Sequence, residues 1–265
     1  MKRHFLFVAA AMLSCSAMFA AAAPKDEVTD AAKKLADAKS YSWKSNTERQ
    51  GGGGGQGQGQ GQGRGGFGGG PVEGQTEKDG FTHVAMTVGE NKIEAITKGD
   101  KGAIKTRDGW QSFAELSAQQ ASDQGQGGQG GRGMMGRMLQ NYPKPAQQAQ
   151  ELAAAAKELA KSDDAYSGEL TEKGAIDLLS FRGGGRRGQG GQAGDGNAPP
   201  PPTNAKGTVK FWVKDGVLSK YEYHVTGTRS FNGNEFNIDR TTTVEIKDVG
   251  SSKVDVPEEA KGKVS

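Results

Sequence analysis

Apolar residues recur at helical spacing near residue 30 and at alternate positions just after it. Over residues 26–39 they follow steps of three and four, which predicts an amphipathic helix with one apolar face. From Tyr41 to Glu48 the period changes to two, with Tyr41 and Trp43 on the same side, which predicts a strand. The folded part of the chain is therefore expected to begin with a helix that leads directly into a strand.

Further segments of alternating apolar residues follow, together with two more helical patterns. Pro145 suits the first turn of a helix whose apolar stripe extends to Ala160, and Thr171 suits the cap of a second helix. An order of helix, several strands, two helices and further strands predicts an α+β fold, with helices covering one face of a large antiparallel sheet. The strands are expected at residues 81–88, 92–98, 103–107, 110–113, 166–170, 209–213, 217–225 and 238–246.

Three tetrapeptides between the expected strands share one pattern: a basic residue, Asp, Gly and an apolar residue. The pattern is typical of a three-residue hairpin loop in which Gly adopts the left-handed conformation. In the third tetrapeptide such a loop places Val213 opposite Val217 and Val209 opposite Tyr221, which keeps one face of the hairpin apolar. The three tetrapeptides are residues 78–81, 107–110 and 214–217.

Glycine is unevenly distributed along the chain. It accounts for 43 of the 265 residues, about twice the usual share of roughly 7%. Most of these glycines lie in three Gly/Gln-rich blocks, which predict disordered, low-complexity insertions at residues 49–70, 119–140 and 182–203. The remainder has an ordinary composition, so residues 23–265 are interpreted as a single α+β domain that these insertions interrupt.

The first 22 residues have the features of a signal peptide. A basic start precedes an uncharged apolar run at residues 5–13, and small residues lead to Ala22. We therefore expect cleavage after Ala22 and a periplasmic or secreted protein without a membrane span. An alternative concerns Cys15, the only cysteine, because residues 13–15 resemble a bacterial lipobox and lipidation would attach the protein to a membrane. If Cys15 leaves with the signal peptide, the mature chain has no thiol.

The charge of the whole chain is nearly balanced, at a net +3. The insertions carry seven arginines and few acidic residues, which leaves a mildly acidic body with basic loops. Arg-Gly segments bind nucleic acid in other settings, but an exported protein is not expected to meet nucleic acid, so weak binding of an envelope polyanion is the corresponding hypothesis. The seven are Arg49, Arg64, Arg132, Arg137, Arg182, Arg186 and Arg187.

The residues that usually carry catalysis are sparse. The mature chain has two histidines, His83 and His224, each in an expected strand, and this is too few for a zinc site. Nucleophile-elbow, zinc-protease and phosphate-loop motifs do not occur. Residues 163–164 and 258–259 are adjacent carboxylates, interpreted as helix-terminus and turn residues rather than as an acid/base pair. We expect a protein that is not an enzyme and that carries no cofactor or metal.

Three stretches carry a resemblance to a known superfamily. They are IEAITKGDK at 93–101 followed by Asp108-Gly109-Trp110, FWVKDGVLSKYEY at 211–223, and VDVPEEAK at 254–261. Together with the helix and strand order, they resemble the periplasmic lipoprotein carriers and lipid-binding lipoproteins of the LolA/LppX superfamily. The resemblance implies a curved half-barrel sheet that holds acyl chains against its helices. It carries over no functional residue, since residues 81–88 lack the arginine that the carriers have on an early strand.

The tryptophans are the candidate ligand-binding residues. An acyl ligand requires a concave apolar surface with few polar groups, and Trp43, Trp110 and Trp212 are predicted to line it. The leading hypothesis is an exported protein that binds a lipid or a lipoprotein acyl chain between sheet and helices. The alternatives are a structural or interaction protein of the cell envelope, whose partner is unknown, and polyanion binding by the basic loops.

Overall fold

The computed structural model describes residues 23–50, 70–88, 91–122, 138–140, 142–180, 200–231 and 234–264. The expected signal peptide, with Cys15, and most of the three expected insertions lie outside these residues. The ends of the insertions belong to described elements: Arg49 ends a strand, residues 119–122 end a helix, and Thr203 begins a strand. The folded body is therefore seen together with the points from which the insertions depart.

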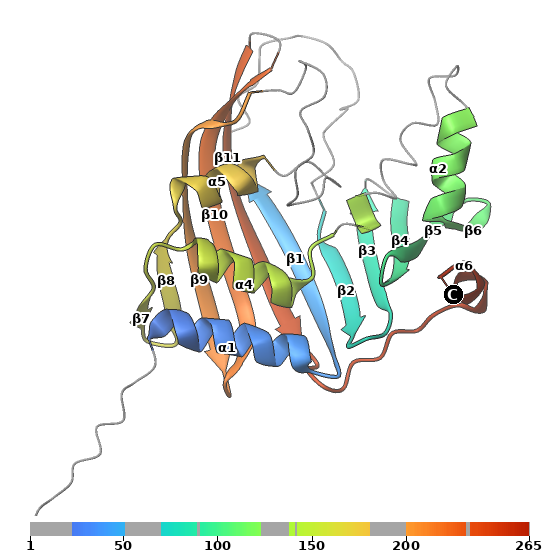
Figure 1. Ribbon diagram of the computed structural model, residues 1–265, viewed down its shortest axis with the longest axis horizontal. Coiled ribbons are helices and arrows are strands. Elements are labelled where there is room, and N and C mark those ends of the chain that lie inside the picture. The colour runs from blue at the N-terminus through green and yellow to red at the C-terminus, as the bar shows by residue number, and fades with distance from the viewer. Residues whose placement is uncertain are drawn as a thin grey trace, which may run out of the picture.

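The strands of the described chain form one 11-stranded sheet, in which all neighbours are antiparallel (Figure 1). The order is β6-β5-β4-β3-β2-β1-β11-β10-β9-β8-β7, so the first and the last strand pair in the middle and the sheet stays open at β6 and β7. The strands are β1 Ser40–Arg49, β2 Val72–Glu77, β3 Thr82–Val88, β4 Asn91–Lys98, β5 Lys101–Thr106, β6 Gly109–Ser112, β7 Ala160–Ser162, β8 Ala165–Glu169, β9 Thr203–Lys214, β10 Val217–Phe231 and β11 Asn234–Lys247.

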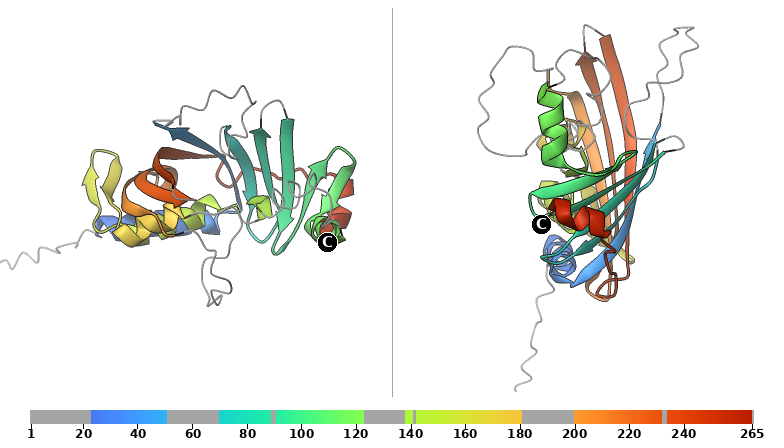
Figure 2. Two further views of the ribbon diagram at one scale, coloured as in Figure 1. Left: turned by 90° about the horizontal axis from the view of Figure 1, so that it is seen from above. Right: turned by 90° about the vertical axis from the view of Figure 1, so that its right-hand side faces the viewer.

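Helices α1, α4 and α5 lie along one side of the curved sheet (Figure 2), and α6 packs on residues of its opposite side. Helix α1 packs on α4 and on β9 and β10, and α5 packs on β9 and β10 as well. At the other end, α2 follows β6 directly, and α6 packs on β4, β5 and β6. The helices are α1 Pro24–Asp37, α2 Phe113–Ser122, α4 Pro145–Ala155, α5 Glu172–Leu179 and α6 Glu258–Val264. The predicted α+β fold with a large curved antiparallel sheet is confirmed.

Two separate apolar clusters define the two faces of the sheet. The larger cluster joins α1, α4 and α5 to one side of the sheet and includes Leu35, Phe211 and Tyr221. The smaller one joins α6 to the other side, through Ile96 and Ala103. Because side chains alternate along a strand, neighbouring residues such as Ala95 and Ile96 belong to different clusters. We call the side of the larger cluster the inner face and the opposite side the outer face.

The hairpin between β9 and β10 corrects the expected register. The loop has two residues rather than three: Lys214 pairs with Val217, and Asp215 and Gly216 have φ angles of 53° and 73°. Positive φ at both positions is typical of a type I′ turn. A bulge between Leu218 and Lys220 then restores the apolar face, because Tyr221 pairs with Phe211 and Tyr223 with Val209. The predicted face is thus correct, and the predicted pairing is wrong.

The helix ends show how far local signals determine the fold. The predicted cap at Thr171 is confirmed, since its Oγ1 accepts a hydrogen bond from the Gly174 amide at 3.1 Å. The helix after Pro145 ends at Ala155 rather than Ala160. Four elements were not expected: β2, β7, α2 and α6. Helix α6 begins at Glu258, so the adjacent carboxylates 258–259 lie in its first turn.

Candidate functional site

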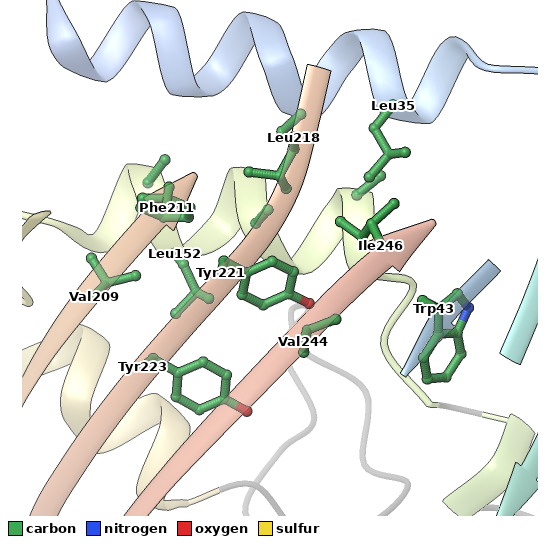
Figure 3. Close-up of a cluster of buried hydrophobic side chains, with 14 of the residues drawn as sticks. Leu35, Trp43, Leu152, Val209, Phe211, Leu218, Tyr221, Tyr223, Val244 and Ile246 are labelled. Atoms are coloured by element: carbon green, nitrogen blue, oxygen red, sulfur yellow. The ribbon is translucent and has the colours of Figure 1, made fainter. Parts of the chain in front are cut away.

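Aromatic side chains gather on the inner face where β1, β10 and β11 lie side by side (Figure 3). Tyr221 and Tyr223 extend from β10 on the same side as Val244 of β11 and Trp43 of β1. All four are less than one tenth exposed. Tyr41 and Tyr142 complete the group, which we call the aromatic cluster: Tyr41, Trp43, Tyr142, Tyr221 and Tyr223.

Trp43 lies flat against the sheet. Its indole covers Gly74 of β2, where a Cβ atom would lie 2.2 Å from the indole Cζ2, so only glycine leaves room for the ring. On its other side the indole stacks on Tyr142, with ring centroids 5.3 Å apart and planes at 10°. The indole N–H donates to Thr76 Oγ1 at 3.3 Å. Trp43 is thus held between the sheet and the segment that leads into α4.

Gln148 of α4 links the helix to the tyrosines of β10. The Tyr221 hydroxyl donates to Gln148 Oε1 at 2.7 Å, and Gln148 Nε2 donates to the Tyr223 hydroxyl at 3.5 Å. Buried hydroxyls are costly unless they are hydrogen-bonded. The glutamine therefore both satisfies the tyrosines and fixes α4 over β10.

Burial keeps the tyrosine hydroxyls of the cluster protonated. It raises the pKa of Tyr142 to about 12, although a hydrogen bond with Ser45 acts in the opposite direction. Burial also raises the pKa of Tyr221 well above 10, helped by the neighbouring tyrosines, and the pKa of Tyr41, against a hydrogen bond with Thr76. The cluster consequently presents apolar rings and neutral hydroxyls, a chemistry that suits the carbonyl or hydroxyl groups of an amphiphile rather than proton transfer near pH 7.

The three tryptophans predicted to share a site lie in three different places. Trp43 belongs to the inner face, whereas Trp110 lies in the outer-face cluster under α6. Trp212 follows the buried Phe211 and therefore also faces outward, where the ammonium groups of Lys210 and Lys220 lie 4.9 and 4.4 Å from its ring centroid. The structure does not bring these three side chains together.

The remaining candidates for chemistry lie in ordinary pairs. His224 Nε2 lies 2.8 Å from Asp239 Oδ1, and His83 Nε2 lies 3.8 Å from Glu94 Oε1. Burial lowers the pKa of His83, in part offset by the Glu94 carboxylate. Within the described ranges, no three His, Cys, Asp or Glu side chains gather so that they could hold a metal ion. Among the described helices, none has both the length and the apolar character needed to cross a membrane.

The tyrosines and Gln148 were not among the residues proposed from the sequence. Part of the signal was present, since alternation places Tyr41 beside Trp43 and places Tyr221 and Tyr223 on the predicted apolar face. For Tyr142 and Gln148 the sequence contains no such signal, because their positions depend on how α4 packs on the sheet.

Comparisons with known proteins concern the fold. No family model matches the sequence, and no curated protein matches it. Among solved structures, the chain is similar to the lipoprotein LppX of Mycobacterium tuberculosis, with a TM-score of 0.41 and 10% identity over 88% of this chain and 98% of that one. It is also similar to LprF of Mycobacterium bovis, with a TM-score of 0.39 and 9% identity over 89% of this chain and 97% of that one.

Proposed function

We propose that this protein is an exported, non-enzymatic protein that binds a hydrophobic ligand, a lipid or an acyl chain, between its sheet and its helices. Residues 1–22 support export, with a mature chain that begins at Ala23. The ligand lies along the inner face with its chain against the aromatic cluster. Trp43 is the proposed contact residue of the three tryptophans, because it alone lies on the inner face, which α1, α4 and α5 cover.

The observation that carries the proposal is the way Trp43 is covered. The face of the indole that points away from the sheet is covered by Tyr142, which lies in the segment before α4. The backbone amide of Tyr142 donates a hydrogen bond to the nearby Leu139 carbonyl oxygen at 3.2 Å. A ring held by stacking on a connecting segment is easier to displace than a ring within a helix or strand. A flat acyl chain can replace Tyr142 on the indole and keep the apolar contact.

Native mass spectrometry of the protein purified gently from its own envelope, followed by organic extraction, tests the proposal directly. We expect an adduct of lipid mass that disappears on delipidation and returns when lipid is added. A bare protein mass together with failure to take up added lipid would instead support a structural or interaction protein of the envelope. The same spectrum tests the processing, because a chain that begins at Ala23 and one acylated at Cys15 differ in mass.

A parallel set of substitutions locates the ligand. Trp43→Leu, Trp110→Leu and Trp212→Leu make the same chemical change on the inner face, under α6 and on the open outer face. With decyl β-D-glucoside as a neutral probe in calorimetry, we expect Trp43→Leu to weaken binding about tenfold, which corresponds to about 1.4 kcal/mol. The other two variants serve as matched controls with unchanged affinity. Weakening by Trp110→Leu or Trp212→Leu alone would place the ligand elsewhere.

A further inference from the structure

Charge is distributed very unevenly over the inner face. On β1, β9, β10 and β11, the inner-face residues, which are the buried positions and those spaced from them by steps of two, are almost all apolar, hydroxyl-bearing or glycine. Three are charged, and all three are arginines: Arg49, Arg229 and Arg240. They lie at the end of the sheet where β1 finishes and the β10–β11 hairpin continues beyond it. Acidic residues of these four strands occupy outer-face positions.

The strand register brings the arginines together. Arg49 lies directly opposite Arg240, and Arg240 lies directly opposite Val225. Directly opposed residues of antiparallel strands share a face, with Cα atoms about 4.5–5.5 Å apart. Arg229 is on the same face, two inner positions beyond Val225. Since like charges placed opposite each other are unfavourable, this arrangement requires an explanation.

Arg240 is the central member of the group. Its Nη2 donates to the Leu178 carbonyl oxygen at the end of α5, while its Nε is buried without an acceptor in the described structure. Burial and the positive charges of Arg49 and Arg229 lower the pKa of Arg240. A guanidinium group has five donors in a planar fork that matches phosphate and carboxylate oxygens. The described structure thus leaves one buried guanidinium donor, Nε, without an acceptor.

On the outer face, lysines of β1 and β11 form ion pairs with glutamates. Lys44 Nζ lies 2.9 Å from Glu73 Oε1, and Lys247 Nζ lies 3.3 Å from Glu245 Oε2. No such ion pair is found for the three arginines among the residues that the structure describes. The difference between the faces is therefore one of charge balance as well as polarity.

The arginines continue the surface formed by the aromatic cluster. Tyr223 lies opposite Thr242, and Arg240 is the next inner-face residue of β11 beyond Thr242. One stripe of the inner face thus changes from apolar side chains near α1, through tyrosine hydroxyls, to guanidinium groups. This order matches that of an anionic amphiphile, in which an apolar chain is followed by a polar linkage and then by an anionic head group.

We propose that Arg49, Arg229 and Arg240 bind the anionic head group of an amphiphilic ligand, a phosphate, sulfate or carboxylate, whose apolar chain lies on the aromatic cluster. The inference rests on the proposed function, because it names the chemical class of the same ligand. Guanidinium forks bind such oxygens through charge-assisted, often bidentate hydrogen bonds. The bound anion supplies the acceptor for Arg240 Nε and balances the opposed charges of Arg49 and Arg240.

Calorimetry with three decyl ligands tests the inference on the full mature chain. Decyl phosphate, decyl β-D-glucoside and decyltrimethylammonium share one chain and differ in head-group charge. We expect decyl phosphate to bind about tenfold or more tightly than the glucoside, and the cation to bind most weakly. Equal binding of phosphate and glucoside overturns the head-group inference and leaves the proposed function standing, whereas absence of binding by all three overturns both. Inorganic phosphate that binds as tightly as decyl phosphate would indicate a site for a free anion and refute a head-group site.

Substitutions assign the effect to the arginines. Arg240→Gln is expected to remove most of the preference for decyl phosphate while the affinity for the glucoside changes less than about twofold. Because Arg240 also bonds to α5, Arg49→Gln supplies a variant at an exposed position that leaves this bond in place. Arg107→Gln, in the exposed turn between β5 and β6, removes the same charge elsewhere and serves as the matched control. A preference that persists in both Arg240→Gln and Arg49→Gln refutes the assignment.

Discussion

Replacing Gly74 with alanine tests the packing of the candidate site most directly. An added Cβ would lie 2.2 Å from Cζ2 and 2.3 Å from Cε2 of Trp43, far inside contact distance. The backbone at this point cannot yield, because Gly74 pairs with both Trp43 of β1 and Val84 of β3. The indole must therefore rotate away from the sheet, and in doing so it loses the stack with Tyr142 and its hydrogen bond to Thr76.

The cost follows from the contacts that the indole gives up. Forcing an extra methyl group into a packed core costs about 1–3 kcal/mol. Within that range, the lost aromatic stack accounts for about 0.5–1.5 kcal/mol and the lost hydrogen bond for about 1 kcal/mol. We expect Gly74→Ala to lower the free energy of unfolding by about 2–3 kcal/mol.

Urea denaturation followed by tryptophan fluorescence measures this loss. Gly262→Ala in α6 is the matched control, since its Cβ meets nothing within 4 Å. We expect that control to leave stability unchanged or to raise it by up to about 1 kcal/mol, because alanine favours a helix. In a Trp43→Leu background the cost of Gly74→Ala should fall below about 1 kcal/mol. A loss of less than about 1 kcal/mol in the original background, or one that persists without the indole, would refute this account of the packing.

Three further predictions concern single groups. Burial raises the pKa of Tyr142 to about 12, so the contribution of its neutral hydroxyl to stability is complete below pH 10 and is lost between pH 10 and 12. Absorbance at 295 nm should show tyrosines that ionise only above the usual range, and the Tyr142→Phe variant should show one fewer of these tyrosines. Thr171→Ala removes the cap of α5 and should cost about 1 kcal/mol in urea denaturation, which Thr171→Ser should largely restore. Burial lowers the pKa of His83, so its contribution to stability is present above pH 6.5 and is lost as the pH falls below it; His83→Gln should flatten the stability profile between pH 7 and 5, and an unchanged profile would contradict this.

Local signals were sufficient where one residue determines the structure. Thr171 and Pro145 both begin helices as expected. Helix α6 had comparable signals, with Pro257 before two glutamates and lysines in its last turn, but the two carboxylates after Pro257 were interpreted as turn residues. Helix α2 also had a start signal, because Ser112 and Glu115 have the spacing of a capping box. In the structure the Ser112 amide donates to Glu115 Oε2 at 2.7 Å and the Glu115 amide donates to Ser112 Oγ at 3.1 Å, whereas residues 110–113 were interpreted only as a strand.

Hairpin registers were harder to predict because one sequence pattern supports several turns. In the three similar tetrapeptides, Asp79 has positive φ in the first, Gly109 in the second, and both Asp215 and Gly216 in the third. The bulge at residue 219 then shifts the register by one residue, and the apolar residues of both strands still lie on one face. Alternation consequently predicts which residues share a face more securely than it predicts which residues are paired.

The candidate site was only partly predictable for the same reason. Alternation places Trp43 and Trp212 on definite sides of their strands, but the side that the helices cover is decided by tertiary packing. The arginines illustrate this further: Arg49 was assigned to a loop insertion, Arg229 lies beyond the strand expected at residues 217–225, and Arg240 was not singled out in the strand expected at residues 238–246. Only the pairing of β1 with β11 places Arg49 beside Arg240.

The pairing of β1 with β11 also determines the order in which the strands of the sheet can pair during folding. Ser42 and Lys247 face each other across the centre of the sheet, although about 200 residues separate them. Strands β2 to β6 and strands β9 to β11 can each form from neighbouring hairpins, but the two halves join only when β11 reaches β1. Closing so long a loop makes this step slow relative to the local hairpins. A chain synthesised from its N-terminus therefore keeps one edge of β1 unpaired until residues 240–247 are available, and truncation before residue 240 removes every pair between β1 and β11.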